Sequence, residues 1–414
     1  MAYKLVKNNR TLTGSIRLVG SKSEGNRVLI IRSLAKRKFS IDNLSEAKDT
    51  VVLLEALDII KRIKYPAETQ TIDVGDTGTA MRFLTAFLAI QNGNFILTGS
   101  DRMMHRPIGI LVDALKKLGA DITYSDRKGF PPLLIKGKPL TNNSVEINGS
   151  VSSQFISSLL LVAPTLQGGL TLKLNGQLVS QPYLSMTLKI MEHFGVKHSW
   201  EENSLFVPQQ KYKSKSFSVG ADWSAASYWY EMAAFADEVD LFIEGLNGDY
   251  LQGDSIASTI FTQFGVITTF EENGIRLTKK QALPESFEFD FADCPDLAQT
   301  LAVTCAGLNV PAKLSGLGNL SIKETDRLYA LDNELLRLGF KVGIQNNSEL
   351  IIQKSSKSCR RNYPVKTYDD HRMAMAFAPL AMLSGEITIE NPEVVQKSYP
   401  EFWNDLQKIG FEIL

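Results

Sequence analysis

The sequence predicts an α/β (α+β) protein built from about six copies of one α+β unit. The chain has 414 residues, and because a domain typically has about 150 residues, this length favours two or three domains. Hydrophobic residues make up 44% and charged residues 22%, which is sufficient for a core and unlike a disordered chain. The third observation is a helix–glycine–strand pattern that recurs along the chain and sets the number of units.

Each copy of this pattern is a segment of helical periodicity that ends in an apolar residue and a glycine, before a β-prone run. We expect these glycines to end their helices in the left-handed backbone region. By subtraction they lie 76, 70, 74 and 71 residues apart. They are Gly119, Gly195, Gly265, Gly339 and Gly410. The first copy should end near Lys64, only 55 residues before Gly119 and without a glycine, so we expect it to be abbreviated.

Further helices and strands can be placed inside these units. Ser180-Gln181-Pro182 is expected to begin a helix, and Asp254 is expected to cap another. β-prone runs predict strands at 95–98, 170–174 and 386–389. Six units divide into three and three, with a junction near 215–222. The sequence therefore predicts two lobes with a cleft between them.

Composition excludes several classes of function. The chain has 45 Lys+Arg and 45 Asp+Glu, so no net charge favours nucleic acid or an anionic membrane, and any anion site must be local. Three cysteines without a Cys-x-x-Cys pair argue against a disulfide framework and favour the cytoplasm. We expect no membrane span and no leader, since no run approaches the roughly 20 apolar residues required. Four histidines without a ligand cluster make a catalytic metal unexpected.

Candidate anion-binding residues in the first half of the chain fall at expected helix starts. Backbone N–H groups and the helix dipole favour an anion there, and an arginine fork can clamp a carboxylate or phosphate. Taken singly, each motif can equally be an ordinary cap, a tight turn or a surface arginine. The candidates are Lys22, Ser23, Arg27, Gly78, Arg106, Ser152, Ser153, Gln154, Ser180 and Tyr183.

The second half of the chain supplies candidate acidic and basic groups. Asp296 precedes an apolar helix, and it is either the cap of that helix or a general base. Lys323 and Arg327 are spaced i, i+4, which is mildly repulsive on a helix unless an anion lies between them. Asp370-His371-Arg372 opens the apolar stretch 373–383, which suggests a site at its N-terminus.

Because nearly all of these residues fall at helix starts of a repeated unit, a cleft lined by such starts would be positive although the chain is neutral. The expected substrates are small polyanions, and carboxylates among the cations would supply the acid and base. A non-catalytic scaffold or nucleic-acid clamp is the alternative from another class, and the neutral charge speaks against it.

Taken together and in order, these strings resemble the 5-enolpyruvylshikimate-3-phosphate synthase family over essentially the whole chain. The most specific strings are Lys323-Glu324-Thr325-Asp326-Arg327 and Asp370-His371-Arg372-Met373-Ala374-Met375. The others are Ser21-Lys22-Ser23 with Asn26-Arg27, Gly78-Thr79-Ala80-Met81-Arg82, Arg106-Pro107-Ile108-Gly109, Ser152-Ser153-Gln154, Ser180 with Pro182-Tyr183, Pro295-Asp296, and Lys397 with Pro400.

The resemblance implies the two-lobed enolpyruvyl transferase fold, in which each lobe has three βαβαββ units around a pseudo-threefold axis. Residues 1–20 and 221–414 would form one lobe, and residues 21–220 the other. The implied reaction, part of the shikimate pathway of aromatic amino acid biosynthesis, transfers the enolpyruvyl group of phosphoenolpyruvate to the 5-hydroxyl of shikimate 3-phosphate and releases phosphate. It implies no cofactor and no metal. We expect a cytoplasmic monomer that binds these two small molecules.

The same resemblance implies roles for individual residues. Asp296 would take the proton from the 5-hydroxyl, and Glu324 would protonate the methylene carbon and later remove a proton, with Lys22 a rival for part of this role. Shikimate 3-phosphate would be bound by Lys22, Ser23, Arg27, Ser152, Ser153, Gln154, Ser180, Tyr183, Asp296, Asn319 and Lys323. Phosphoenolpyruvate would be bound by Lys22, Gly78, Arg106, Gln154, Arg327, Arg372 and Lys397.

The chain departs from the family's usual pattern at two positions and one segment. Asp76 stands where the family usually has Asn, Phe83 where many members have Pro, and the stretch after Ile63 is shortened. From Phe83 we expect a reshaped phosphoenolpyruvate pocket and an altered sensitivity to the inhibitor glyphosate, and we expect Asp76→Asn to be tolerated. The sister transferase that acts on UDP-N-acetylglucosamine is a weaker match. That family typically carries a reactive Cys before its Arg-Pro pair, whereas this chain has Met103, Met104 and His105 before Arg106-Pro107.

Overall fold

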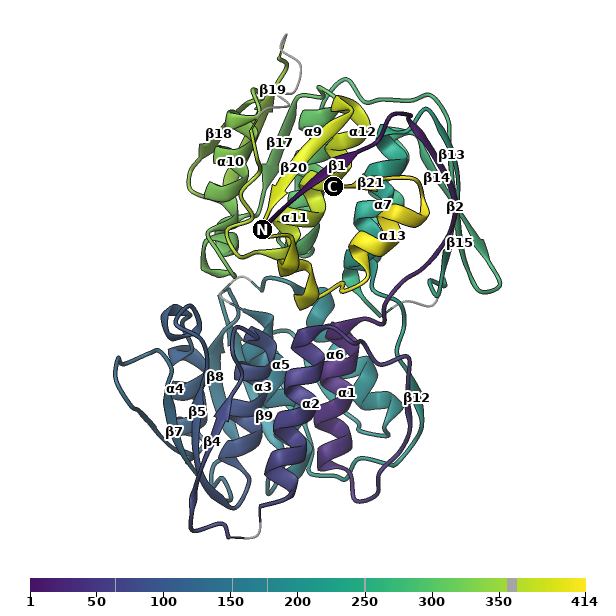
Figure 1. The fold of residues 1–414 in the computed structure, drawn as a ribbon. Coiled ribbons are helices and arrows are strands. Elements are labelled where there is room, and N and C mark those ends of the chain that lie inside the picture. Colours follow the sequence, from purple (N-terminus) through teal and green to yellow (C-terminus); the bar gives the residue numbers. More distant parts are fainter. Residues whose placement is uncertain (64, 151, 177, 249–250, 356–362) are drawn as a thin grey trace. The chain divides into compact units, whose positions relative to one another are not determined.

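The structure is a computed structural model that describes residues 1–63, 65–150, 152–176, 178–248, 251–355 and 363–414. The chain divides into two compact units. Unit 1 consists of Met1–Gly20 with Gly220–Leu414, and unit 2 of Ser21–Val219. The first strands of the chain, drawn in purple, accordingly lie among the green and yellow elements of unit 1 (Figure 1). Lys64 and Cys359 lie outside the described residues, while Cys294 and Cys305 are buried and free.

Unit 2 contains two complete βαβαββ repeats with the same sheet topology. In each four-stranded sheet the first two strands are parallel, and the last two form an antiparallel hairpin whose second strand pairs with the second strand of the repeat. One repeat is β4 (Thr69–Asp73), α3 (Gly78–Ala89), β5 (Gly93–Thr98), α4 (Gly109–Lys117), β6 (Asp121–Tyr124) and β7 (Leu133–Gly137). The other is β8 (Ser144–Asn148), α5 (Ser153–Val162), β9 (Leu170–Asn175), α6 (Gln181–His193), β10 (Ser199–Glu201) and β11 (Ser204–Val207).

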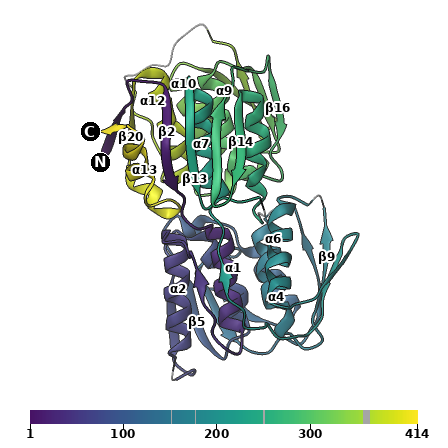
Figure 2. The same cartoon turned by 90° about the vertical axis from the view of Figure 1, so that its right-hand side faces the viewer.

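Unit 1 contains two further repeats with this topology, and they flank its buried helices (Figure 2). In the first of them, the whole of unit 2 is inserted into the chain between β2 and α7. That repeat is β2 (Thr11–Arg17), α7 (Trp223–Phe235), β13 (Glu238–Glu244), α8 (Ala257–Ile260), β14 (Val266–Glu271) and β15 (Gly274–Lys279). The next is β16 (Phe287–Asp290), α9 (Ala298–Gly307), β17 (Ala312–Ser315), α10 (Arg327–Arg337), β18 (Lys341–Gln345) and β19 (Glu349–Gln353).

The remaining two repeats are modified, one in each unit. In unit 1 an isolated parallel bridge between Val365 and Ile389 replaces the first strand, and the N-terminal strand β1 closes the sheet β20-β1-β21. In unit 2 only the parallel pair β3 and β12 is present, and no strand lies between α2 and β4 among the described residues, as the shortened stretch predicts. The modified repeat of unit 1 consists of β1 (Ala2–Val6), α11 (His371–Phe377), α12 (Ala381–Ser384), β20 (Glu386–Glu390), α13 (Phe402–Lys408) and β21 (Glu412–Ile413). The modified repeat of unit 2 consists of α1 (Lys22–Leu34), β3 (Ile41–Asp42), α2 (Lys48–Lys61) and β12 (Phe217–Ser218).

The five glycines that counted the units all have positive φ, between 81° and 101°, and each ends a helix before a strand. An L-residue with a Cβ is strained in this region, so glycine is the natural stop. The prediction that each of these glycines ends a helix before a strand is therefore confirmed, but the last two strands of each complete repeat follow the glycine, so the glycine does not mark the end of the copy. The predicted strands at 95–98, 170–174 and 386–389 also lie within β5, β9 and β20.

Two local predictions are wrong. Asp254 does not cap a helix, because 253–264 is a short α-helix between two 3-10 turns and the Asp254 carboxylate instead accepts a hydrogen bond from Ser224. Lys323 and Arg327 do not share a helix face. A 3-10 helix ends at Ile322, the chain bends through 323–325, and α10 begins only at Arg327.

Candidate active site

In unit 1, one buried guanidinium joins three carboxylates. Arg327 is the first residue of α10 and is 2% exposed. Its Nε donates to Asp370 Oδ2 at 2.7 Å, its Nη1 to Asp296 Oδ1 at 3.1 Å, and its Nη2 to Glu324 Oε2 at 2.8 Å. Burial would lower the pKa of Arg327, but the charges of Asp370, Glu324 and Asp296 raise it above its usual value. The two candidate acid–base carboxylates, Asp296 and Glu324, are thus held by the same cation.

Two more cations complete this arrangement, which we call the unit 1 cluster: Arg327, Arg372, Lys397, Asp296, Glu324 and Asp370. Arg372, in the first turn of α11, places Nη2 2.7 Å from Asp296 Oδ2 and Nη1 3.3 Å from both Tyr228 Oη and the Asp296 carbonyl. Lys397 Nζ lies 3.5 Å from Glu324 Oε1. Asp370 caps α11 by accepting from the Arg372 N–H at 2.9 Å. Asp296 and Glu324 retain partial exposure, so a substrate can reach their oxygens.

Lys323 and Asn319 precede the cluster on the same stretch of chain. Burial lowers the pKa of Lys323, whereas the negative charge of Asp296 acts to raise it. The charges of Lys323 and Asp296 therefore interact. Asn319 lies in the 3-10 helix Gly318–Ile322, and its buried Oδ1 has no hydrogen-bond partner among the described residues. The structure therefore brings Lys323 into the electrostatic field of the cluster, while among the described residues Asn319 makes no hydrogen bond to it.

A second buried carboxyl lies next to the cluster, and sequence reasoning gave it a different role. Asp254 is fully buried, and burial, followed by the charge of Asp296, raises its pKa to about 7, while Arg372 and the hydrogen bond from Ser224 act to lower it. Gln252 Nε2 donates to Asp222 Oδ1 at 3.1 Å and to Ser224 Oγ at 3.0 Å, which fixes this hydroxyl. No local spacing signals this network, because Ser224 and Asp254 are 30 residues apart.

In unit 2, most of the candidate residues lie at the starts of α1, α3, α5 and α6, which pack together, whereas Arg27 lies one turn further along α1 and Arg106 follows the 3-10 turn Met103–His105. Ser21 caps α1, so that Lys22 and Ser23 form its first turn, and Gly78 is the first residue of α3. Ser152 caps α5 by accepting from the Gln154 N–H at 3.3 Å, and Gln154 Nε2 donates to Thr79 Oγ1 at 3.2 Å. Ser180 precedes α6 in the left-handed region with φ 56°. These first turns present backbone N–H groups and hydroxyls, a chemistry suited to phosphate.

Arg27 is buried among neutral groups rather than carboxylates. Its Nε donates to Thr187 Oγ1 at 2.7 Å, its Nη1 to the Ser23 carbonyl at 2.7 Å, and its Nη2 to Ser157 Oγ at 3.2 Å and to the Tyr183 carbonyl at 3.3 Å. Burial lowers its pKa to about 10, which still leaves it charged at neutral pH. The ring of Phe83 lies 5.5 Å from its Cζ, close enough for a cation–π interaction. The unusual Phe83 therefore contacts an arginine assigned to shikimate 3-phosphate.

Gly78 and Arg106 are adjacent in unit 2. A Cβ on Gly78 would lie 2.6 Å from Arg106 Nη1 and 2.5 Å from Arg82 Nη1, so a larger residue here would displace the two guanidiniums from their present positions. Arg82 Nη1 donates to the Gly78 carbonyl at 2.8 Å. Lys22 Nζ lies 3.1 Å from Asp49 Oδ2, and this carboxylate is a contact that the sequence motifs did not signal.

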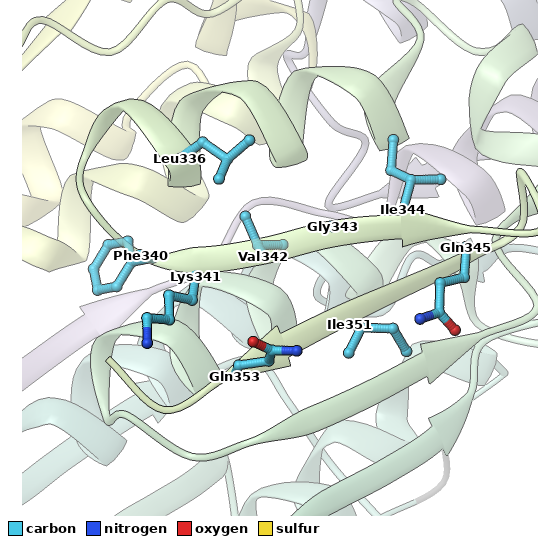
Figure 3. A pocket seen from close by; sticks show the side chains of 9 residues that line it. All are labelled: Leu336, Phe340, Lys341, Val342, Gly343, Ile344, Gln345, Ile351 and Gln353. Atoms are coloured by element: carbon cyan, nitrogen blue, oxygen red, sulfur yellow. The ribbon is translucent and has the colours of Figure 1, made fainter. Parts of the chain in front are cut away.

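Other features of the described residues lie apart from these groups. A hollow of about 360 Å³ lies between α10 and the edge strand β18, and its lining includes Leu336, Phe340 and Ile351 but none of the candidate site residues (Figure 3). No group of three or more His, Cys, Asp or Glu that could hold a metal ion occurs in the described part of the chain. Nor do we find there a helix capable of spanning a bilayer.

Comparison with known proteins identifies the family. The model of the family described as EPSP synthase (3-phosphoshikimate 1-carboxyvinyltransferase) matches residues 6–406. The 3-phosphoshikimate 1-carboxyvinyltransferase of Bacteroides fragilis (strain YCH46) is 46% identical over 403 residues, which cover 97% of this chain and 96% of that protein. The enzyme of that name from Marinomonas sp. (strain MWYL1) is 35% identical over 410 residues, with 94% and 95% covered.

Solved structures share the fold. EPSP synthase from Acinetobacter baumannii matches with a TM-score of 0.78 at 21% identity, covering 100% of this chain and 99% of that one. The enolpyruvyl transferase NikO from Streptomyces tendae matches with a TM-score of 0.75 at 17% identity, covering 100% and 98%. The predicted two-lobed enolpyruvyl transferase fold is confirmed. The chain belongs to the EPSP synthase (3-phosphoshikimate 1-carboxyvinyltransferase) family.

Proposed function

We propose how residues of the two units carry out the reaction of this family, the transfer of the enolpyruvyl group of phosphoenolpyruvate to the 5-hydroxyl of shikimate 3-phosphate with release of phosphate. The observation that carries the proposal is that Arg327 bonds both Asp296 and Glu324. A pair of carboxylates fixed by one cation can exchange protons with a substrate without moving. The reaction needs one proton acceptor and one proton donor, and this pair supplies both.

Asp296 is the base that takes the proton from the 5-hydroxyl of shikimate 3-phosphate. It is a charged acceptor because Arg327 and Arg372 each lie within 3.1 Å of one of its oxygens. Glu324, which enters this step protonated, then delivers its proton to the methylene carbon of phosphoenolpyruvate and takes one back from the same carbon as the C–O bond to phosphate breaks. The proton that Asp296 took from the 5-hydroxyl leaves with the phosphate. Lys22 is a rival for part of this proton transfer, and Lys397, whose Nζ lies 3.5 Å from Glu324 Oε1, is assigned to phosphoenolpyruvate.

Cations of both units bind the negative charges of phosphoenolpyruvate and of the tetrahedral intermediate. Lys22, Gly78, Arg106 and Gln154 of unit 2 and Arg327, Arg372 and Lys397 of unit 1 are the groups assigned to it. Because the guanidiniums are already held by hydrogen bonds, little reorganisation is needed when charge develops in the transition state.

Shikimate 3-phosphate is bound mainly by hydroxyls and helix starts of unit 2. Ser23, Ser152, Ser153, Ser180 and Tyr183 lie at the first turns of α1, α5 and α6. Arg27 supplies the fixed positive charge there, Gln154 contacts both substrates, and Asn319 and Lys323 of unit 1 complete the set with Asp296. Neutral donors suit this role because N–H groups and hydroxyls at helix N-termini can bind a phosphate without a charged side chain at each contact.

We further propose that the enzyme acts as a monomer in the cytoplasm without cofactor or metal. All of the assigned residues belong to one chain, so no partner chain is required. Light scattering behind size-exclusion chromatography tests the first part, and a mass of twice 45.9 kDa would contradict it.

The test is phosphate release by purified protein given phosphoenolpyruvate and shikimate 3-phosphate, with each substrate alone as a control. Release that requires both substrates and is lost in Asp296→Ala supports the assignment. The matched control is Asp293→Ala, which removes an exposed carboxylate three residues away. Absence of release from folded wild-type protein would contradict the reaction, and full activity of Asp296→Ala would contradict the role of this base.

A further inference from the structure

The tight turn that leads into α11 has an unfavourable backbone conformation. The N–H of Asp370 donates to the carbonyl of Thr367 at 2.9 Å, which closes the turn. Its two central residues, Tyr368 and Asp369, have φ values of 53° and 56°. Turns with positive φ at both central positions favour Gly, Asn and Asp, and a tyrosine is strained there. Such a conformation persists only where contacts outside the turn stabilise it.

A buried carboxylate of α10 supplies these contacts. Tyr368 Oη donates to Glu334 Oε1 at 2.7 Å, and Asn333 Nδ2 donates to Tyr368 Oη. Glu334 is 1% exposed, and its oxygens also accept from Arg337 Nη1 at 2.7 Å and from the Lys366 N–H at 3.1 Å. Burial and the hydrogen bond to Glu334 raise the pKa of Tyr368 to about 12, so its hydroxyl remains a donor at neutral pH. The turn is therefore bonded to a fixed acceptor.

The same helix also bonds the end of the turn. Arg327 begins α10, and Glu334 lies about two turns later on the same face. Arg327 Nε donates to Asp370 Oδ2 at 2.7 Å, while Glu334 accepts from Tyr368. Asp370 in turn accepts from the N–H of Arg372 at 2.9 Å and so caps α11. The backbone of the turn thus determines where Arg372 begins.

We propose that Tyr368 is a positioning residue for phosphoenolpyruvate binding, which bonds the turn 367–370 to Glu334 and thereby places Arg372. The proposal rests on the proposed assignment of phosphoenolpyruvate to Arg372. The guanidinium of Arg372 lies 2.7 Å from Asp296 Oδ2, so its place in the site is narrowly defined, and a shifted turn would misalign it with the bound anion. Asp296 and Glu324 would keep their hydrogen bonds to Arg327, which belongs to α10 and not to the turn.

The experiment is Tyr368→Phe, which keeps the ring and removes the hydroxyl, followed by phosphate release at varied concentrations of each substrate. We expect KM for phosphoenolpyruvate to rise about 3- to 10-fold, with kcat and KM for shikimate 3-phosphate changed less than about twofold. The matched control is Tyr329→Phe, which removes the hydroxyl of an exposed tyrosine on α10. Circular dichroism checks that both variants are folded.

A second substitution tests whether strain in the turn is the cause. Glycine adopts the φ of 56° found at Asp369 without strain, so Asp369→Gly should make the turn less dependent on Tyr368. In the double variant Tyr368→Phe/Asp369→Gly, we expect KM for phosphoenolpyruvate to return to within about twofold of that of Asp369→Gly alone. Asp369→Asn removes the same charge but keeps a Cβ, so in the Tyr368→Phe background it should restore less.

Several results would overturn the proposal. One is a KM for phosphoenolpyruvate in Tyr368→Phe equal to that in Tyr329→Phe, and another is a kcat that falls as much as this KM rises. A glycine that restores no more than the asparagine would also overturn it, and so would a Tyr368→Phe protein that does not fold. Wild-type protein that needs only one substrate, or releases no phosphate, would overturn the proposed function and this proposal with it.

Discussion

The buried arginines of the two units are satisfied in opposite ways. In unit 1, Arg327 bonds the carboxylates of Asp370, Asp296 and Glu324. In unit 2, Arg27 is equally buried, yet it bonds two hydroxyls and two backbone carbonyls. The first arrangement places proton-exchanging groups around a cation. The second places a cation among groups that do not titrate near neutral pH.

This difference indicates a division of labour between the units. Carboxylates held by cations suit acid–base chemistry, and a cation held by neutral dipoles keeps its charge available for an anion. The division also predicts different costs of removing each arginine, because a charge left without its partner costs more than a dipole in the same position.

The largest effect is expected for the base of unit 1. In Asp296→Asn the side chain keeps its shape but no longer accepts a proton, so we expect kcat to fall by about 10³-fold with smaller changes in both KM values. Steady-state phosphate release measures this, with Asp293→Asn as the control. A kcat within tenfold of wild type would show that proton transfer does not depend on this carboxylate.

Removal of the cation that joins the unit 1 cluster should destabilise the fold. Arg327→Met leaves Asp370, which is fully buried, without its cation, and we expect a loss of about 3–5 kcal/mol in the free energy of unfolding. Urea denaturation followed by circular dichroism measures the loss. Arg276→Met, which breaks two exposed ion pairs, with Asp240 and with Glu271, should cost far less. Equal losses in the two variants would contradict the structural role of Arg327.

The corresponding change in unit 2 should cost less. Arg27→Met leaves Ser157, Thr187 and two backbone carbonyls with fewer partners but no stranded charge, so we expect a loss of about 1–3 kcal/mol in the same denaturation assay. We also expect KM for shikimate 3-phosphate to rise more than KM for phosphoenolpyruvate. If Arg27→Met destabilised the protein as much as Arg327→Met, the contrast between the units would be wrong.

The smallest effect concerns a carboxyl of unit 1 outside the cluster. Glu231 is fully buried in α7, has no hydrogen-bond partner among the described residues, and burial raises its pKa well above the ordinary value. The folded state then keeps a proton that the unfolded chain releases above about pH 4.5, so stability falls as pH rises beyond that point. Glu231→Met removes this dependence.

We therefore expect Glu231→Met to raise the free energy of unfolding by about 1–2 kcal/mol at pH 8 and by less at pH 5. Denaturation of both proteins at the two pH values tests this. A gain that is larger at pH 5 than at pH 8 would show that Glu231 is ionised in the folded protein, in which case the sign of the argument is wrong.

Features of the fold and site that depend on local chemistry were predictable from sequence. The glycine stops, the helix starts at Lys22 and Gly78, and the shortened first copy follow from capping, turn preferences and spacing. Long-range contacts were not predictable in this way. Arg27 meets its hydroxyl partners 130 and 160 residues away, and Arg327 meets Asp370 43 residues away.

The errors have the same origin. A cap was expected at Asp254 because an apolar helical period follows it. Instead its carboxylate is buried and accepts a hydrogen bond from Ser224, which lies 30 residues earlier. Lys323 and Arg327, spaced i, i+4, would share one helix face only if the helix were unbroken, whereas the chain bends before Arg327. No spacing in the sequence identifies Asp370 as a partner of Arg327, although its neighbour Arg372 was among the predicted site residues.

The division of labour is tested most directly by phosphate release from Asp296→Asn and Arg27→Met at rising concentrations of shikimate 3-phosphate, with phosphoenolpyruvate in excess. We predict that the rate of Arg27→Met recovers toward the wild-type rate as shikimate 3-phosphate increases, because that variant is impaired in binding. The rate of Asp296→Asn should stay about 10³-fold lower at every concentration. Recovery of Asp296→Asn, with a rate for Arg27→Met that no concentration restores, would contradict the account.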